Sequence, residues 1–217
     1  MIQLTRSGVT GSADTAALAD QFGRMHTFRL RGLIHPDLLR FVQEQLERSE
    51  WSFRRDGELG TEATPANTIP ADILSFAANT PAFLETIRRI TGCAEIRGFG
   101  GRVYRMARSE HRDKWHDDVA PQYGRLVGMS INLSAAPYHG GVFCLRERAT
   151  ERPICEMPNT RAGDAIFFRI SEKLQHIVTE VGSEVPKTAF AGWFTSGESF
   201  HHLILAKSGH GKDAGTA

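Results

Sequence analysis

The pattern of hydrophobic residues changes once along this chain, near Gly92, and that change most constrains the fold. Before Gly92, apolar residues recur at helical spacing: Leu38, Leu39, Val42 and Leu46 fit a helix with one buried face. After Gly92, short apolar runs separated by glycine-rich turns predict strands. Helices followed by many evenly spaced strands indicate an α+β, mainly β protein whose strands form a sandwich or barrel.

The same patterns predict the individual elements. A helix start is expected near Asp14, a strand at residues 28–34, and helices at 38–46, 71–78 and 81–91, while the polar stretch 51–70 is expected to be a loop. Strands are expected at 97–108 (one or two), 126–133, 142–146, 154–157, 165–170, 175–181 and 187–194. Because no linker separates the halves, residues 1–206 are expected to form one domain, with a helical part at about 1–94 and a β core at about 95–196. The polar end, residues 207–217, is expected to be a disordered tail.

Composition excludes several classes of protein. Of 217 residues, 41% are hydrophobic and 24% are charged, as in a soluble globular protein. The net charge of +1 gives no reason to expect nucleic acid or an anionic membrane as a partner. No apolar run approaches the roughly 20 residues of a membrane span, and the first residues do not resemble a secretory signal. Three cysteines, none in Cys-x-x-Cys spacing, predict neither a disulfide framework nor a zinc knuckle. We therefore expect a cytoplasmic protein; its oligomeric state stays open.

A candidate metal-binding pair lies in the middle of the chain. His116 and Asp118 are two residues apart, so on an extended strand both side chains would leave the same face. An imidazole and a carboxylate placed together can bind a first-row transition metal if a third ligand arrives from elsewhere, and His176 is the best candidate. His111 and Asp113 have the same spacing, but their charged neighbours favour a solvated loop.

Two of the expected strands each have one face that suits a cavity wall better than a dry core. The faces consist of small or polar residues: Lys187, Ala189, Ala191 and Trp193 on one strand, and Gly128, Ser130, Asn132 and Ser134 on the other. The alanines leave room for a ligand. Because an unpaired buried ammonium is costly, Lys187 calls for a carboxylate partner from the protein or from a ligand.

The order of these motifs resembles that of the Fe(II)- and 2-oxoglutarate-dependent dioxygenases of the prolyl 4-hydroxylase-like type. The resemblance covers about residues 95–196 and rests on the ordered set His116-x-Asp118, Asn132-Leu133-Ser134, Gly140-Gly141, Gly163-Asp164-Ala165-Ile166-Phe167-Phe168, His176, Lys187 and Trp193-Phe194. It implies a double-stranded β-helix, or jelly roll, with N-terminal helices packed on one sheet.

The resemblance also implies roles for single residues. The residues that it assigns to Fe(II) are His116, Asp118 and His176. Lys187, which follows His176 by 11 residues (187 − 176), takes the place of the basic residue that pairs with the distal carboxylate of 2-oxoglutarate. Asn132 and Tyr104 match positions that help to hold this cosubstrate. The chain departs from many relatives in having lysine for arginine at 187 and asparagine for tyrosine at 132.

The implied activity is hydroxylation of an aliphatic C–H bond, with O₂ consumed and 2-oxoglutarate decarboxylated to succinate and CO₂. Related halogenases lack the carboxylate at the position of Asp118, so aspartate favours hydroxylation. A small molecule or amino-acid derivative is the preferred substrate. Three alternatives stay open: a hydroxylase of prolyl or other protein residues, a non-catalytic jelly-roll binding module, and a cupin-like metalloenzyme, whose usual His-x-His is missing at residues 116–118.

Overall fold

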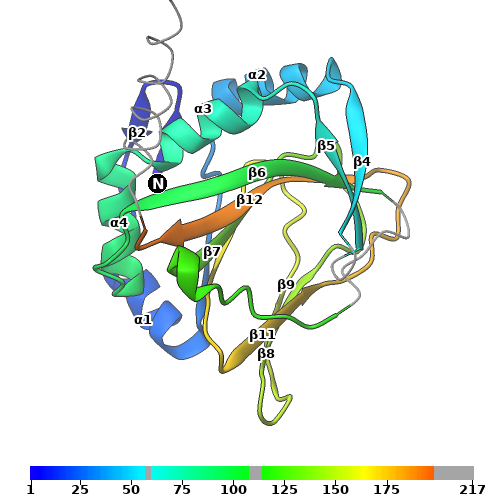
Figure 1. Ribbon diagram of the computed structural model, residues 1–217. Coiled ribbons are helices and arrows are strands. Elements are labelled where there is room, and N and C mark those ends of the chain that lie inside the picture. The colour runs from blue at the N-terminus through cyan, green and yellow to red at the C-terminus, as the bar shows by residue number, and fades with distance from the viewer. Residues whose placement is uncertain (57–59, 108–113, 198–217) are drawn as a thin grey trace, which may run out of the picture.

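The computed structural model describes residues 1–56, 60–107 and 114–197. The predicted tail at 207–217 and the competing pair His111 and Asp113 lie outside these residues. Two antiparallel sheets face each other, as expected for a double-stranded β-helix (Figure 1). The larger has the order β3 (Thr27–Leu30), β10 (Ala165–Arg169), β7 (Arg125–Asn132), β12 (Lys187–Thr195), β6 (Gly98–Met106), β5 (Gly60–Pro65), β4 (Trp51–Asp56). The smaller has the order β11 (Leu174–Val178), β8 (Phe143–Glu147), β9 (Pro153–Met157).

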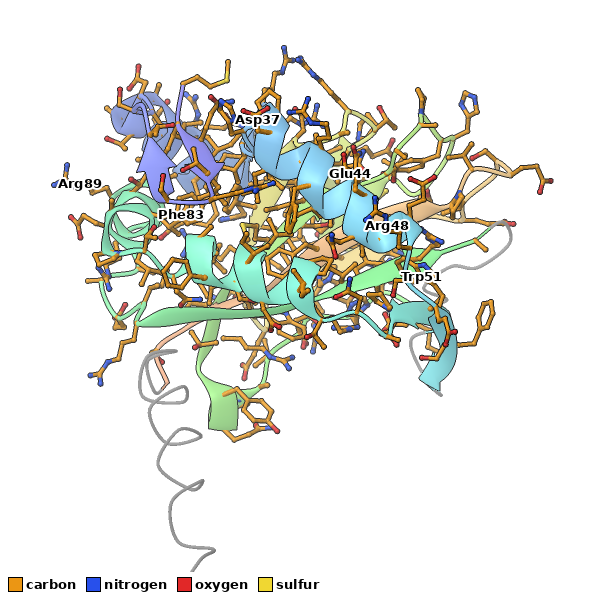
Figure 2. All side chains as sticks on the ribbon, turned by 90° about the horizontal axis from the view of Figure 1, so that it is seen from above. Asp37, Glu44, Arg48, Trp51, Phe83 and Arg89 are labelled. Carbon is orange, nitrogen blue, oxygen red and sulfur yellow. The ribbon has the colours of Figure 1, made fainter. Side chains whose placement is uncertain are left out.

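The helices cover the outer face of the larger sheet, away from the smaller one (Figure 1). They are α1 (Thr15–Met25), α2 (Pro36–Glu47), α3 (Ile69–Ala78) and α4 (Pro81–Thr91). A small hairpin of β1 (Gln3–Thr5) and β2 (Gly8–Thr10) precedes α1, and a short 3₁₀ turn (Pro121–Tyr123) lies between β6 and β7. Figure 2 looks down on this layer, where Asp37, Glu44 and Arg48 lie along α2. These three residues are exposed, while the opposite side of α2 is buried in the core. The prediction of N-terminal helices packed on one sheet is confirmed.

Local signals account for the helix ends. The Asp14 side chain accepts a hydrogen bond from Ala17 N (3.0 Å) and caps α1. Helix α4 has the predicted bounds: Pro81 occupies the first turn, where its missing N–H is not needed, and Gly92 ends the helix in the left-handed conformation (φ 70°).

The hydrophobic core lies between the helices and the larger sheet. Phe28 on β3 stacks on Phe167 on β10 with ring centroids 4.4 Å apart, and Phe194 on β12 contacts Phe99 on β6 at 4.8 Å. All four side chains are almost completely buried. Each such phenylalanine contributes about 1.5–3 kcal/mol by its removal from water. The faces of β6, β10 and β12 that carry these rings are thereby fixed against the helices, which leaves their other faces toward the smaller sheet.

The prediction of a loop at 51–70 is wrong, because part of this segment forms the hairpin of β4 and β5. The hairpin lies at the edge of the larger sheet, and its polar sequence gives no alternation of apolar residues. It is held instead by tertiary contacts: Ala63 pairs with Arg105 on β6, and the Glu62 carboxylate accepts two hydrogen bonds from the Arg102 guanidinium. No helix in the described part of the chain has both the length and the apolar character needed to span a membrane.

Candidate metal centre and cosubstrate cavity

Two histidines meet at the edge of the smaller sheet. His176 lies on β11, and His116 pairs with it through an isolated antiparallel bridge. The two backbones exchange both hydrogen bonds, from His116 N to His176 O (3.1 Å) and from His176 N to His116 O (2.8 Å). Their ring centroids are therefore only 4.2 Å apart, on the side that faces the larger sheet.

Asp118 joins the histidines by a different route from the one expected. The prediction that His116 and Asp118 leave the same face of an extended strand is wrong. Asp118 is not in a strand and has a φ of 57°. Aspartate tolerates this left-handed conformation better than most residues. The turn brings Asp118 Oδ1 to 3.7 Å from His116 Nε2 and Asp118 Oδ2 to 3.5 Å from His176 Nε2. The three side chains predicted to meet do meet, although the backbone reason differs.

The three side chains fit a first-row metal ion. One donor atom from each residue lies within 4.8 Å of the others. Two ligands about 2.1 Å from an ion and at right angles to each other are roughly 3.0 Å apart, so small side-chain movements would close the site. His116 Nδ1 lies 3.0 Å from the Lys114 carbonyl, and with its proton on Nδ1 the Nε2 lone pair is directed toward the other donors.

The Asp118 carboxylate is positioned by the larger sheet. The indole Nε1–H of Trp193 on β12 donates to Asp118 Oδ2 at 2.8 Å. Burial by itself would raise the pKa of the Asp118 carboxyl, but His176, the Trp193 hydrogen bond, His116 and Arg125 lower it, and the net shift is downward. Asp118 is therefore an ionised carboxylate at neutral pH, as a metal ligand must be.

These residues line a cavity of about 330 Å³ between the two sheets. Lys187, at the start of β12, also lines it, and only 3% of this residue is exposed. Its Nζ donates to the Gly141 carbonyl at 3.0 Å. Gly141 has a φ of 59°, and a Cβ there would lie 3.0 Å from Lys187 Cδ. A glycine at 141 therefore fits both the turn and the path of the lysine side chain.

With this geometry in place, the comparisons with known proteins identify the family. Residues 101–195 match the family model of the 2OG-Fe(II) oxygenase superfamily, a segment that contains all three candidate ligands and Lys187. This part of the chain belongs to the 2OG-Fe(II) oxygenase superfamily. Family members use Fe(II), 2-oxoglutarate and O₂, and the chain is accordingly a 2-oxoglutarate-dependent dioxygenase.

Solved structures agree on the fold of this oxygenase. A 2OG-Fe(II) oxygenase family oxidoreductase from Burkholderia pseudomallei has a TM-score of 0.65 at 16% identity, with 87% of this chain and 94% of that chain covered. A prolyl-4-hydroxylase from Pseudomonas putida has a TM-score of 0.62 at 16% identity, with coverage of 83% and 98%. The epimerase SnoN from nogalamycin biosynthesis has a TM-score of 0.59 at 15% identity, with coverage of 86% and 87%. No curated protein sequence matches the chain.

The two weaker candidates for the oxygenase's cosubstrate site lie in different places. Tyr104 on β6 is buried and lines the cavity. Asn132 does not line it: the residue is buried at the end of β7, where its Oδ1 accepts from Ser134 N at 2.9 Å. Among the described residues, Asn132 Nδ2 has no hydrogen-bond partner. Contact of either residue with 2-oxoglutarate stays a prediction.

Two arginines also line the cavity of this oxygenase. From the sequence, Arg102 and Arg125 belong to a set of five arginines that could equally bind a carboxylate-bearing substrate or form a scattered, solvated face; in the structure both border the site. Alternation with Tyr104 on β6 could have placed Arg102, because the two residues share a face. Periodicity could not have placed Arg125, because the pairing of β7 with β12 shifts register next to this residue.

Proposed function

We propose that this oxygenase hydroxylates an aliphatic C–H bond of a small molecule or amino-acid derivative. The convergence of His116, Asp118 and His176 on one cavity with the buried Lys187 is the observation that carries the proposal. In the reaction, one oxygen atom of O₂ enters the product alcohol and the other enters succinate, and 2-oxoglutarate loses CO₂. When bound, Fe(II) would supply the oxidative chemistry, and the protein would supply position and the cavity between the two sheets.

The residues have separate tasks in this proposal. The residues that would hold Fe(II) are His116, Asp118 and His176, whose donor atoms lie within 4.8 Å of one another. Trp193 positions the Asp118 carboxylate through its 2.8 Å hydrogen bond. The Lys187 ammonium would bind the distal carboxylate of 2-oxoglutarate as a point charge, in place of the two-pronged contact that arginine makes. Retention of the Asp118 carboxylate favours hydroxylation over halogenation.

The size of the cavity supports a small substrate. About 330 Å³ lies at the lower end of the usual range for small-molecule sites, and this space has to take 2-oxoglutarate as well as the reacting part of the substrate. The alternative, hydroxylation of a prolyl or other protein residue, needs only one side chain to enter. The fold shared with the Pseudomonas putida prolyl-4-hydroxylase is compatible with it.

Succinate release that requires both Fe(II) and 2-oxoglutarate is the test of the catalytic proposal. We expect His176→Ala to abolish it and to weaken Mn(II) binding in calorimetry, where Mn(II) substitutes for Fe(II). His139→Ala, which removes an exposed histidine outside the cavity, is the matched control and should change neither measurement. Undiminished turnover in folded His176→Ala would defeat the metal assignment, and a wild type that binds neither Mn(II) nor 2-oxoglutarate would favour a non-catalytic binding module.

A further inference from the structure

A β-bulge turns Arg125 into the cavity. On β7, Val127, Met129 and Ile131 face the helices, so simple alternation would send residue 125 the same way. The pairing with β12 shifts register, however: Phe194 pairs with Val127, and the next residue, Thr195, pairs with Arg125. Residue 126 is thus the additional residue of the bulge. Bulges of this kind re-aim side chains, and they are common beside active sites.

The bulge exchanges the places of two very different side chains. Leu126 packs against the hydrophobic core, while Arg125 lines the cavity beside the candidate metal ligands. The guanidinium carbon of Arg125 lies 3.6 Å from the centroid of the Trp193 ring, the same indole that bonds Asp118. Arg125 Nη1 also donates to the Asp118 carbonyl at 3.3 Å. The arginine is therefore oriented next to the reaction centre by both a stacking contact and a hydrogen bond.

The charge of Arg125 differs from that of Arg102 in how it is balanced. Arg102 is held by the buried Glu62 carboxylate through hydrogen bonds of 3.0 and 2.9 Å, so the protein itself neutralises this charge. For Arg125, the described residues provide the Asp118 carbonyl and two aromatic faces as direct contacts. The Asp118 carboxylate is near enough for the two charges to attract, but it forms no ion pair with Arg125. Its remaining N–H groups form a planar donor edge of the kind that matches a carboxylate.

Arg125 and Lys187 cannot serve the same anion. Lys187 and the partner of Arg125, Thr195, are eight residues apart on β12 (195 − 187). At about 3.3 Å per residue, their backbones are separated by roughly 26 Å. This distance exceeds the combined reach of a lysine and an arginine side chain, so the two cannot bind one carboxylate together. The 2-oxoglutarate carboxylate proposed for Lys187 thus lies at the opposite end of the inward face, and Arg125 is left for a second anion.

We propose that Arg125 recognises a carboxylate group of the primary substrate and holds it at the end of the cavity opposite Lys187. This inference rests on the proposed function and narrows its substrate to carboxylate-bearing small molecules. Ala191 and Ser130, which line the wall between the two cations, are small and leave space for the part of the substrate that is oxidised.

Paired compounds test this inference. The probes are the twenty L-amino acids and the straight-chain monocarboxylates from acetate to octanoate, each with its primary amide. The readout is probe-stimulated succinate formation by the Fe(II)-loaded protein. We expect stimulation by one or more carboxylates and at least about 30-fold less stimulation by the matching amides. Arg125→Met should remove the preference for the carboxylate, and Arg125→Lys should retain part of it.

Controls separate the possible failures. Arg40→Met, which removes an exposed arginine on α2, should keep the full preference. Binding of 2-oxoglutarate to the Mn(II)-loaded wild type is measured first, and its absence would defeat the proposed function itself. If 2-oxoglutarate binds, three results overturn the Arg125 inference alone: equal stimulation by amides, equal preference in folded Arg125→Met, or stimulation by no probe.

Discussion

Replacement of Lys187 by methionine tests the cosubstrate site most directly. Methionine keeps the unbranched shape and removes the charge, so the cavity wall should stay in place. Because Lys187 is 3% exposed, its interaction with a carboxylate is little weakened by water. A hydrogen bond to a charged group in such a setting contributes about 2–3 kcal/mol, so we expect the Kd for 2-oxoglutarate to rise roughly 30- to 150-fold.

The assay compares 2-oxoglutarate with 2-oxopentanoate, which has a methyl group in place of the distal carboxylate. Calorimetric titration of the Mn(II)-loaded protein under nitrogen gives both Kd values without turnover. Wild type should prefer 2-oxoglutarate by the full 30- to 150-fold factor, while Lys187→Met should bind the two compounds about equally. Equal loss of affinity for both compounds would show that the change disturbs the site generally. An unchanged Kd for 2-oxoglutarate would refute the proposed role of Lys187.

Two further substitutions test the surroundings of the site. Trp193→Phe removes the N–H that holds Asp118 and should raise the Kd for Mn(II) about 10- to 100-fold, measured by calorimetry; an unchanged Kd would contradict the positioning role. Gly128→Ala places a Cβ in overlap with the Phe168 ring and should reduce the free energy of unfolding by about 1–3 kcal/mol in urea titrations. Gly23→Ala is its control, since a Cβ at that helical position meets open space and should stabilise α1 by up to about 1 kcal/mol. Equal stability of the two alanine variants would refute this account of Gly128.

Local signals explain the elements that the sequence predicts well. The bounds of α4 depend on Pro81 and Gly92, whose conformational preferences act without help from the rest of the fold. The inward face of β12 follows from alternation alone, so Lys187 and Trp193 could be assigned to the cavity in advance. The same holds for Ser130 on β7.

Tertiary contacts explain what the sequence does not predict. The β4–β5 hairpin is polar and is attached to the sheet by pairs such as Glu62 with Arg102, which are 40 residues apart in sequence (102 − 62). Asp118 departs from strand geometry, and its carboxylate is held by Trp193 on β12, which is 75 residues away in the sequence (193 − 118). These arrangements depend on partners that only the folded chain brings together.

The bulge at residue 126 also bears on how this oxygenase could change during evolution. A bulge is equivalent to one inserted residue, and side chains alternate along a strand with a period of two. Loss of Arg125 would restore regular alternation and bring Leu126 opposite Thr195 at the cavity wall, whereas loss of Leu126 would leave Arg125 in that place. His116, Asp118 and His176 lie outside β7, so none of them would have to mutate. If Arg125 has the proposed role, deletion of its single codon would change the substrate preference and leave every candidate iron ligand in place.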